Sequence, residues 1–71
     1  EGGMVAPMPG KILEVLVEQG QSVASGDLLL VMEAMKMEHR IVANVDGVIA
    51  MMNLKEGDQV QQGDILVEIS E

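Results

Sequence analysis

The chain contains one internal repeat, and this repeat limits the folds that it can adopt. A shift of thirty-seven positions lays residues 4–33 over residues 41–70. Nine of the thirty aligned pairs are identical, namely Val5/Val42, Ala6/Ala43, Gly10/Gly47, Ile12/Ile49, Gly20/Gly57, Val23/Val60, Gly26/Gly63, Asp27/Asp64 and Leu29/Leu66. Two copies are too few for a solenoid, which needs at least three stacked repeats for stability. The sequence therefore predicts one domain with a pseudo-twofold axis.

Short apolar segments separated by glycine-containing turns make up both copies. The candidate strands are residues 4–6, 11–18, 28–32, 41–44, 48–54 and 65–69. They are rich in Val, Ile and Leu, and none is long enough to favour a helix. Val23 and Val60 stand alone as isolated apolar residues between turns. We expect an all-β barrel or sandwich without α-helix. Its core must be aliphatic and methionine-based, because the sequence has no Phe, Tyr or Trp.

Each copy contains a Gly-Asp pair at the same place, Gly26-Asp27 in the first and Gly63-Asp64 in the second. Glycine tolerates a positive φ, and an aspartate side chain can accept a hydrogen bond from a nearby backbone N–H group. We therefore expect both pairs to form structural turns. The pair Asp46-Gly47 is typical of a tight β-hairpin turn, and the pattern predicts one there.

Composition excludes several classes of function. The formal net charge is −8 and aromatic residues are absent, which argues against nucleic acid and against anionic membranes as partners. No apolar run approaches a membrane span, so we expect no membrane insertion. With no cysteine and His39 as the only histidine, the sequence offers no plausible metal site. No serine has a histidine partner placed by a motif, so a catalytic residue is not predicted.

Lys36 is the residue that the repeat does not explain. It lies in the link between the copies, flanked by Met35 and Met37, in a chain with only four basic residues. If residues 28–32 and 41–44 pair as antiparallel strands, Lys36 lies near the tip of a hairpin. An exposed lysine on a rigid hairpin suits the attachment of a swinging arm by another protein. The simpler alternative is a solubilising turn lysine, but exposed methionines are more typical of an adaptable contact surface.

The segment Glu33-Ala34-Met35-Lys36-Met37 resembles the biotin-attachment motif of biotin-dependent carboxylases. The resemblance covers the whole chain, because residues 6–10 resemble the lead-in of that family and both Gly-Asp turns match its paired turns. It implies a flattened β-barrel of two four-stranded antiparallel sheets with pseudo-twofold symmetry and Lys36 on a hairpin turn. We assign residues 4–71 to a biotinyl carrier domain, with the repeats at 4–33 and 41–70, and residues 1–3 to a flexible lead-in.

This resemblance also implies a function. Biotin protein ligase would join biotin to the Lys36 amine through an amide bond, with Glu33, Ala34, Met35 and Met37 as recognition residues. The attached biotin would carry a carboxyl group from a biotin carboxylase to a carboxyltransferase, which are the expected partner domains or subunits. The chain would supply reach and recognition and would not be an enzyme on its own. As an isolated domain it is expected to be monomeric.

The resemblance leaves the parent enzyme and two other functions open. Residues 17–27 and 54–64 are equally long, so the first copy lacks the extra protruding segment of some bacterial carrier domains. In this the chain resembles the carrier domains of propionyl-, methylcrotonyl- or pyruvate-type carboxylases and of transcarboxylases. The segment Met37-Glu38-His39 resembles that of some acyl-CoA carboxylases, so we favour an acyl-CoA carboxylase, with pyruvate carboxylase, transcarboxylase or decarboxylase as alternatives. Lipoyl carrier domains share the duplicated barrel but usually have Asp-Lys-Ala at the tip, where this chain has Met35-Lys36-Met37. An unmodified interaction module that uses the two methionines is the third hypothesis.

Overall fold

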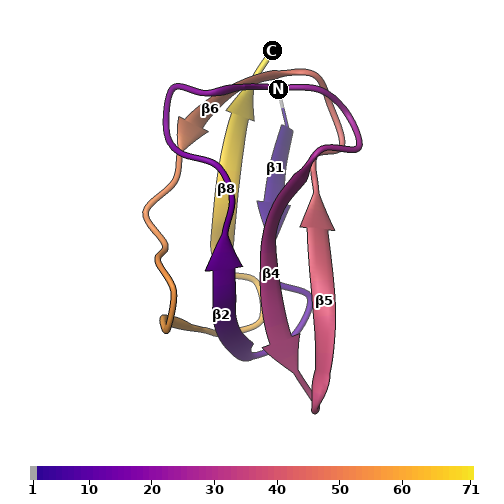
Figure 1. Cartoon of the computed structure of the whole chain (residues 1–71), viewed down its shortest axis with the longest axis vertical. Coiled ribbons are helices and arrows are strands. Elements are labelled where there is room, and N and C mark those ends of the chain that lie inside the picture. The colour runs from indigo at the N-terminus through magenta and orange to yellow at the C-terminus, as the bar shows by residue number, and fades with distance from the viewer. Residues whose placement is uncertain (1) are drawn as a thin grey trace.

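The structure is a computed structural model and describes residues 2–71. Eight strands and no helix are present in this range, so no membrane-spanning helix is found there. The strands are β1 (Gly2–Val5), β2 (Gly10–Val15), β3 (Ser22–Val23), β4 (Leu28–Ala34), β5 (Met37–Val42), β6 (Gly47–Met51), β7 (Gln59–Val60) and β8 (Ile65–Ser70). Figure 1 shows β1, β2, β4, β5 and β8 running along the long axis of a molecule that measures 32 × 17 × 17 Å.

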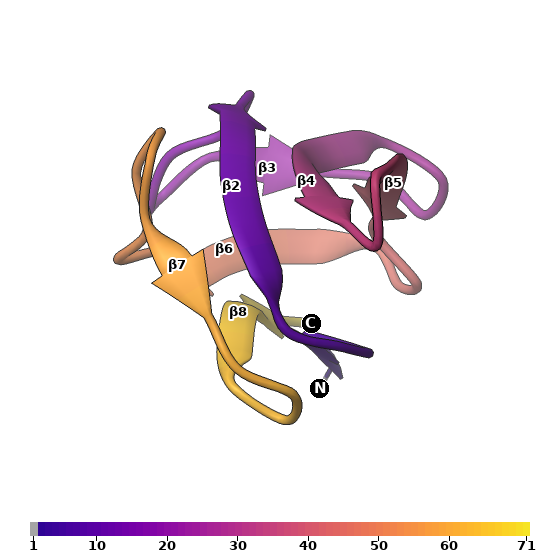
Figure 2. The ribbon, with the colours of Figure 1, turned by 90° about the horizontal axis from the view of Figure 1, so that it is seen from below.

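Two four-stranded antiparallel sheets form the fold, with strand orders β1-β8-β6-β3 and β5-β4-β2-β7. The thirty-seven-residue shift converts one order into the other, since it carries β1 to β5, β2 to β6, β3 to β7 and β4 to β8. Seen along the long axis, the strands curl around a shared interior (Figure 2). The predicted flattened barrel with pseudo-twofold symmetry is confirmed.

Backbone hydrogen bonds between the two copies follow the same symmetry. Gly26 N donates to Ala43 O at 2.8 Å, and the related bond from Gly63 N to Ala6 O measures 2.9 Å. In both cases the turn of one copy is bonded to the chain of the other. The two halves are therefore interlocked, and each supplies the backbone partners that the other lacks.

The Gly-Asp turns have the predicted geometry. Gly26 and Gly63 have φ values of 95° and 89°, which are accessible to glycine and strained for most other residues. Asp27 Oδ2 accepts a hydrogen bond from the backbone N–H of residue 24 at 2.9 Å. Asp64 Oδ2 accepts the related bond from residue 61 at 2.8 Å. In each copy, the glycine thus allows the backbone conformation of the turn, and the aspartate closes the turn with a hydrogen bond.

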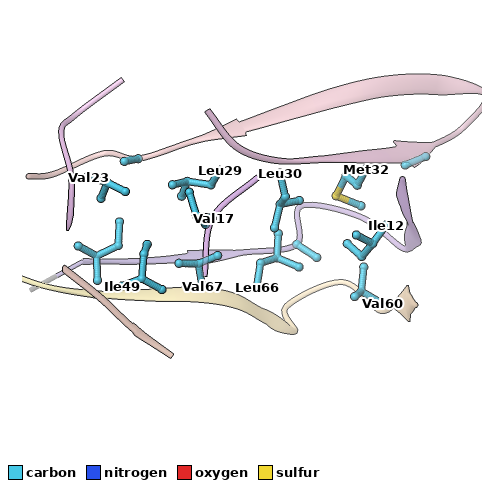
Figure 3. Close-up of a cluster of buried hydrophobic side chains, with 14 residues drawn as sticks. Ile12, Val17, Val23, Leu29, Leu30, Met32, Ile49, Val60, Leu66 and Val67 are labelled. Atoms are coloured by element: carbon cyan, nitrogen blue, oxygen red, sulfur yellow. The ribbon is translucent and has the colours of Figure 1, made fainter. Parts of the chain in front are cut away.

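The core lies between the two sheets and draws on both copies (Figure 3). Its largest fully buried side chains are Ile12, Leu29, Leu30, Met32, Ile49, Leu66, Val67 and Ile69. The predicted run 28–32 is indeed buried over most of its length, and a β-bulge between Leu28 and Leu30 in the pairing with β5 accompanies this. Burial of each large aliphatic side chain contributes roughly 1.5–3 kcal/mol, so these residues dominate the stability of the domain.

Two predicted strands end earlier than the sequence pattern indicates. The segments 11–18 and 48–54 were too long as predicted, because β2 stops at Val15 and β6 stops at Met51. Beyond these points the chain leaves one sheet and crosses to the other, where Gly20 N bonds Ile49 O and Gly57 N bonds Ile12 O, both at 2.8 Å. After the crossing, Val23 and Val60 each lie in a two-residue strand and are not isolated.

The predicted hairpin turn at Asp46-Gly47 is wrong. Strands β5 and β6 belong to different sheets, so the segment between them is a crossover. Gly47 instead begins β6 and pairs with Val23, while Asp46 Oδ1 accepts a hydrogen bond from Ser25 N at 2.7 Å. An Asp-Gly pair favours a turn locally, but the topology of the two sheets determines which strands become neighbours.

Part of the lead-in assigned to residues 1–3 lies in a strand. Glu1 lies outside the described residues, but Gly2 and Gly3 belong to β1 and pair with Ile69 and Glu68 of β8. Strand pairing uses backbone N–H and C=O groups, which glycine supplies as well as any residue. The lack of a side chain at these two glycines therefore does not prevent strand pairing.

Candidate functional site

A two-residue turn, Met35-Lys36, joins β4 to β5 at one end of the long axis (Figure 1). The strands pair from Leu28↔Val42 to Ala34↔Met37, which leaves these two residues to form the turn. The start of β1 and the end of β8 pair at the opposite end of the molecule. The predicted hairpin is confirmed, and its two-residue link is much shorter than the segment 33–40 that separates the predicted strands 28–32 and 41–44.

The backbone of this turn is unusual for its sequence. Met35 and Lys36 have φ values of 54° and 65°, and they are the only non-glycine residues with positive φ in the described part of the chain. Positive φ at both central residues characterises the type I′ turn, which is usually occupied by Asn-Gly. A left-handed conformation costs other residues about 1 kcal/mol or more, so packing elsewhere in the hairpin must hold these two.

Lys36 is exposed at this tip. Within residues 2–71, neither an ion pair nor a hydrogen bond engages its ammonium group. The two methionines beside it are also exposed, Met35 to 82% and Met37 to 64%. The amine of Lys36 is therefore accessible to another protein. The exposed thioether side chains on either side of it offer that protein an apolar contact.

The strand register determines which neighbours reach the surface near Lys36. Glu33 and Glu38 lie directly opposite each other on β4 and β5, and both are exposed. Ala34, in contrast, is only 4% exposed, so its side chain belongs to the core. Of the four predicted recognition residues, Glu33, Met35 and Met37 therefore present side chains to solvent, while Ala34 contributes its backbone and a buried methyl group.

Two further residues hold the end of β4. His39 Nε2 lies 3.3 Å from the carbonyl oxygen of Ala34, and Gly10, the first residue of β2, packs against the same strand from the other side. No special role was predicted for His39, and Gly10 was noted as one of the identical pairs and as part of the lead-in at residues 6–10. The identity of Gly10 and Gly47 in the repeat was the sign in the sequence that Gly10 has a structural role.

A shallow groove lies beside the turn and includes residues of both copies. Its lining is formed by Pro9, Gly10, Lys11, Glu33, Ala34, Met35, Lys36, Gln59, Val60 and Gln61. The described residues contain no cluster of three or more His, Cys, Asp or Glu side chains arranged to hold a metal ion. The tip therefore combines one exposed amine with a contact surface.

Comparison with known families identifies one match along almost the whole chain. The sequence model of the family described as "Biotin-requiring enzyme" matches residues 3–69. A biotin carboxyl carrier protein of Streptococcus mutans is 45% identical over 67 residues, which cover 94% of this chain and 52% of the relative. The match therefore includes both copies of the repeat and the turn between them.

Two other relatives are much longer proteins. The biotin-dependent acyl-coenzyme A carboxylase alpha3 subunit of Mycobacterium leprae is 44% identical over 93% of this chain and 11% of its own length. Pyruvate carboxylase of Bacillus subtilis is also 44% identical over 93% of this chain, and 6% of its own length is covered. The chain thus spans between 6% and 52% of the length of these curated relatives.

Among solved structures, the lipoyl domain of the 2-oxoglutarate dehydrogenase complex from Azotobacter vinelandii has a similar fold. The TM-score is 0.78 at 30% sequence identity, and the match covers 89% of this chain and 80% of that domain. The likeness fits the two-sheet barrel described above.

Proposed function

The chain belongs to the family of biotin-requiring enzymes, and from this premise we propose that it is a biotin carboxyl carrier domain with biotin attached to Lys36. Biotin is the cofactor of that family. The observation that carries the proposal is the position of Lys36, an exposed and unpaired amine on a two-residue turn at one end of a rigid barrel.

The tip fits a covalently attached biotin. Nζ of Lys36 would form an amide bond with the carboxyl group of biotin, and the side chain would lose its positive charge. Biotin, when bound, supplies a ureido nitrogen that can hold and release a carboxyl group. The chain itself would hold the attachment point away from the barrel, because the hairpin lies at one end of the long axis and Lys36 is exposed there.

The neighbours of Lys36 would act in recognition. Biotin protein ligase is the proposed partner for attachment, with Met35 and Met37 as exposed apolar contacts and Glu33 as a charged one. The buried Ala34 would act indirectly, by seating the end of β4 in the core. Because Ala34 is buried, a larger side chain at this position would have to displace its neighbours, and the turn would then move relative to the barrel.

The proposed partners in carboxyl transfer are a biotin carboxylase and a carboxyltransferase, as domains of the same chain or as separate subunits. We favour an acyl-CoA carboxylase as the parent enzyme. A pyruvate carboxylase is the principal alternative, since relatives of both names match equally well at 44% identity. A transcarboxylase or decarboxylase would use the carrier in the same way, so the carrier domain alone does not distinguish these enzymes.

A lipoyl carrier domain is the second candidate function, because a solved lipoyl domain has the same fold. Both groups would be attached to the same lysine through the same type of bond. The residues on either side of Lys36 would then decide between the ligases, and the chain has methionine at both of these positions.

Intact mass after incubation with biotin, MgATP and a biotin protein ligase tests the proposal. We expect the parent to gain one biotinyl unit, Lys36→Arg to gain none, and Lys55→Arg to behave as the parent does. Lys55 is a suitable control because it too is an exposed lysine beside a turn, in the second copy. Modification of Lys36→Arg would refute the assigned site. A folded parent that accepts lipoate from a lipoate ligase but not biotin would favour the second function.

A further inference from the structure

Gly10 occupies a position where no side chain fits. A Cβ atom built on it would lie 2.5 Å from the carbonyl oxygen of Glu33 and 2.6 Å from Cε of Met32. It would also lie 3.2 Å from Cβ of Ala34. The Met32 methyl group can rotate away, but the Glu33 carbonyl belongs to the backbone of β4. Gly10 does not have a positive φ, so space is the constraint at this position.

The atoms that Gly10 contacts lead directly into the turn. Glu33 and Ala34 are the last two residues before Met35-Lys36, and Lys11 of β2 is the register partner of Glu33. On the opposite side, His39 Nε2 lies 3.3 Å from the Ala34 carbonyl. The end of β4 is thus held between β2 and β5. Displacement of the Glu33 carbonyl must therefore move the end of β4 and, with it, the left-handed turn at Met35-Lys36.

We propose that Gly10 is a positioning residue for the modification of Lys36. Its missing side chain lets β2 approach the end of β4, and this approach fixes the orientation in which the turn presents the amine to the ligase. The inference rests on the proposed function, since it concerns the same lysine. Gly10 itself touches no reacting atom. Its effect passes through the backbone of Glu33 and Ala34, both of which line the groove beside Lys36.

The repeat supplies a matched control at the opposite end of the molecule. Gly47 is related to Gly10 by the thirty-seven-residue shift, and it begins β6 as Gly10 begins β2. A Cβ atom there would collide with the carbonyl oxygen of Ser70 and lie 2.8 Å from Cγ2 of Ile69. Ser70 is the counterpart of Glu33, but it ends β8, far from the turn. Both glycines therefore have the same local role, and only Gly10 lies next to Lys36.

The test compares Gly10→Ala with Gly47→Ala in three measurements. Thermal unfolding by far-ultraviolet circular dichroism gives the loss of stability, which we expect to be similar. Intact mass gives kcat/KM for biotin incorporation by the ligase. Peptide mapping gives the rate at which a small acylating reagent modifies Lys36, with Lys55 as internal reference. We expect kcat/KM to fall about tenfold in Gly10→Ala alone, because a misplacement of about 1 Å can cost roughly a hundredfold and the displacement expected here is smaller.

The outcomes separate the inference from the proposed function. No incorporation into the parent would refute the function itself. Equal ligase rates for the two variants at equal stability would overturn the inference, as would an equal fall in the rate with the small reagent, which would indicate a hindered amine. If Gly10→Ala does not fold, Gly10→Ala/Met32→Leu replaces it in the same comparison. The shorter leucine removes the Cε contact and leaves the contact with the Glu33 carbonyl.

Discussion

Replacement of Met35 by asparagine should stabilise this protein, although it removes an apolar side chain. Met35 has a φ of 54°, and a left-handed conformation costs an ordinary L-residue about 1 kcal/mol or more. Asparagine adopts this conformation more readily, because its short side chain hydrogen-bonds to the local backbone. The methionine side chain is 82% exposed, so almost no buried area is lost. The substitution leaves the charge unchanged.

The net gain is about 0.5–1 kcal/mol in the free energy of unfolding. For a domain of this size, 1 kcal/mol corresponds to roughly 4–8 °C in Tm, so Tm should rise by about 2–8 °C. Far-ultraviolet circular dichroism is the suitable assay, because the chain has no aromatic residue to report unfolding by fluorescence or near-ultraviolet absorption.

Met37→Asn is the matched control for this prediction. It makes the same exchange two residues away, at a residue that is 64% exposed but lies in β5 without a positive φ. Asparagine is disfavoured in strands, so the Tm of Met37→Asn should stay the same or fall. A lower Tm for Met35→Asn, or an equal rise for both variants, would refute the reasoning about backbone strain.

The same variant tests the recognition role of Met35. If its thioether contacts the ligase, loss of about 1 kcal/mol of contact energy lowers kcat/KM for biotin incorporation about fivefold. The variant would then be more stable and less readily modified. A rate equal to or above that of the parent would remove Met35 from the recognition surface.

Two further predictions use the internal symmetry. Leu29→Ala and Leu66→Ala should each lower the free energy of unfolding by about 2–5 kcal/mol, and by similar amounts, because both side chains are fully buried at equivalent places. Urea unfolding measures this, and a much smaller loss in either variant would contradict the equivalence. Asp27→Ala and Asp64→Ala should each cost about 0.5–1.5 kcal/mol through loss of one hydrogen bond to the turn backbone. An unchanged urea midpoint for both would show that these bonds contribute nothing net.

Local sequence patterns predicted the strands and turns that depend mainly on residues close together in the sequence. The continuous apolar run 28–32 indicated a buried strand, and the Gly26-Asp27 and Gly63-Asp64 pairs indicated their turns. The pattern failed where the chain crosses between sheets. Leu16 and Val17 continue the apolar character of the strand, but β2 has already ended at Val15 and Leu16 is 43% exposed. A crossing depends on where the second sheet lies, and no local window contains that information.

At the candidate site, the residues were predicted from the sequence but their backbone conformation was not. Lys36 and its methionine neighbours were predicted from the sequence, because they stand where the repeat has no counterpart. The positive φ of Met35 and Lys36 was not predictable, since neither residue favours it. This conformation is imposed by the pairing of β4 with β5, which continues to Ala34↔Met37 and leaves two residues to reverse the chain.

By itself, the sequence determined that the fold has two equivalent halves, that its core is aliphatic, and that one lysine stands outside the repeat. These are properties of residue type and spacing, which a single chain displays directly. Only the tertiary structure decided that the halves interlock, that Ala34 is buried while Glu33 is exposed, and that Gly10 and Gly47 each admit a neighbouring strand. These features depend on which strands become neighbours. Burial of the apolar faces of both sheets in one core determines that arrangement.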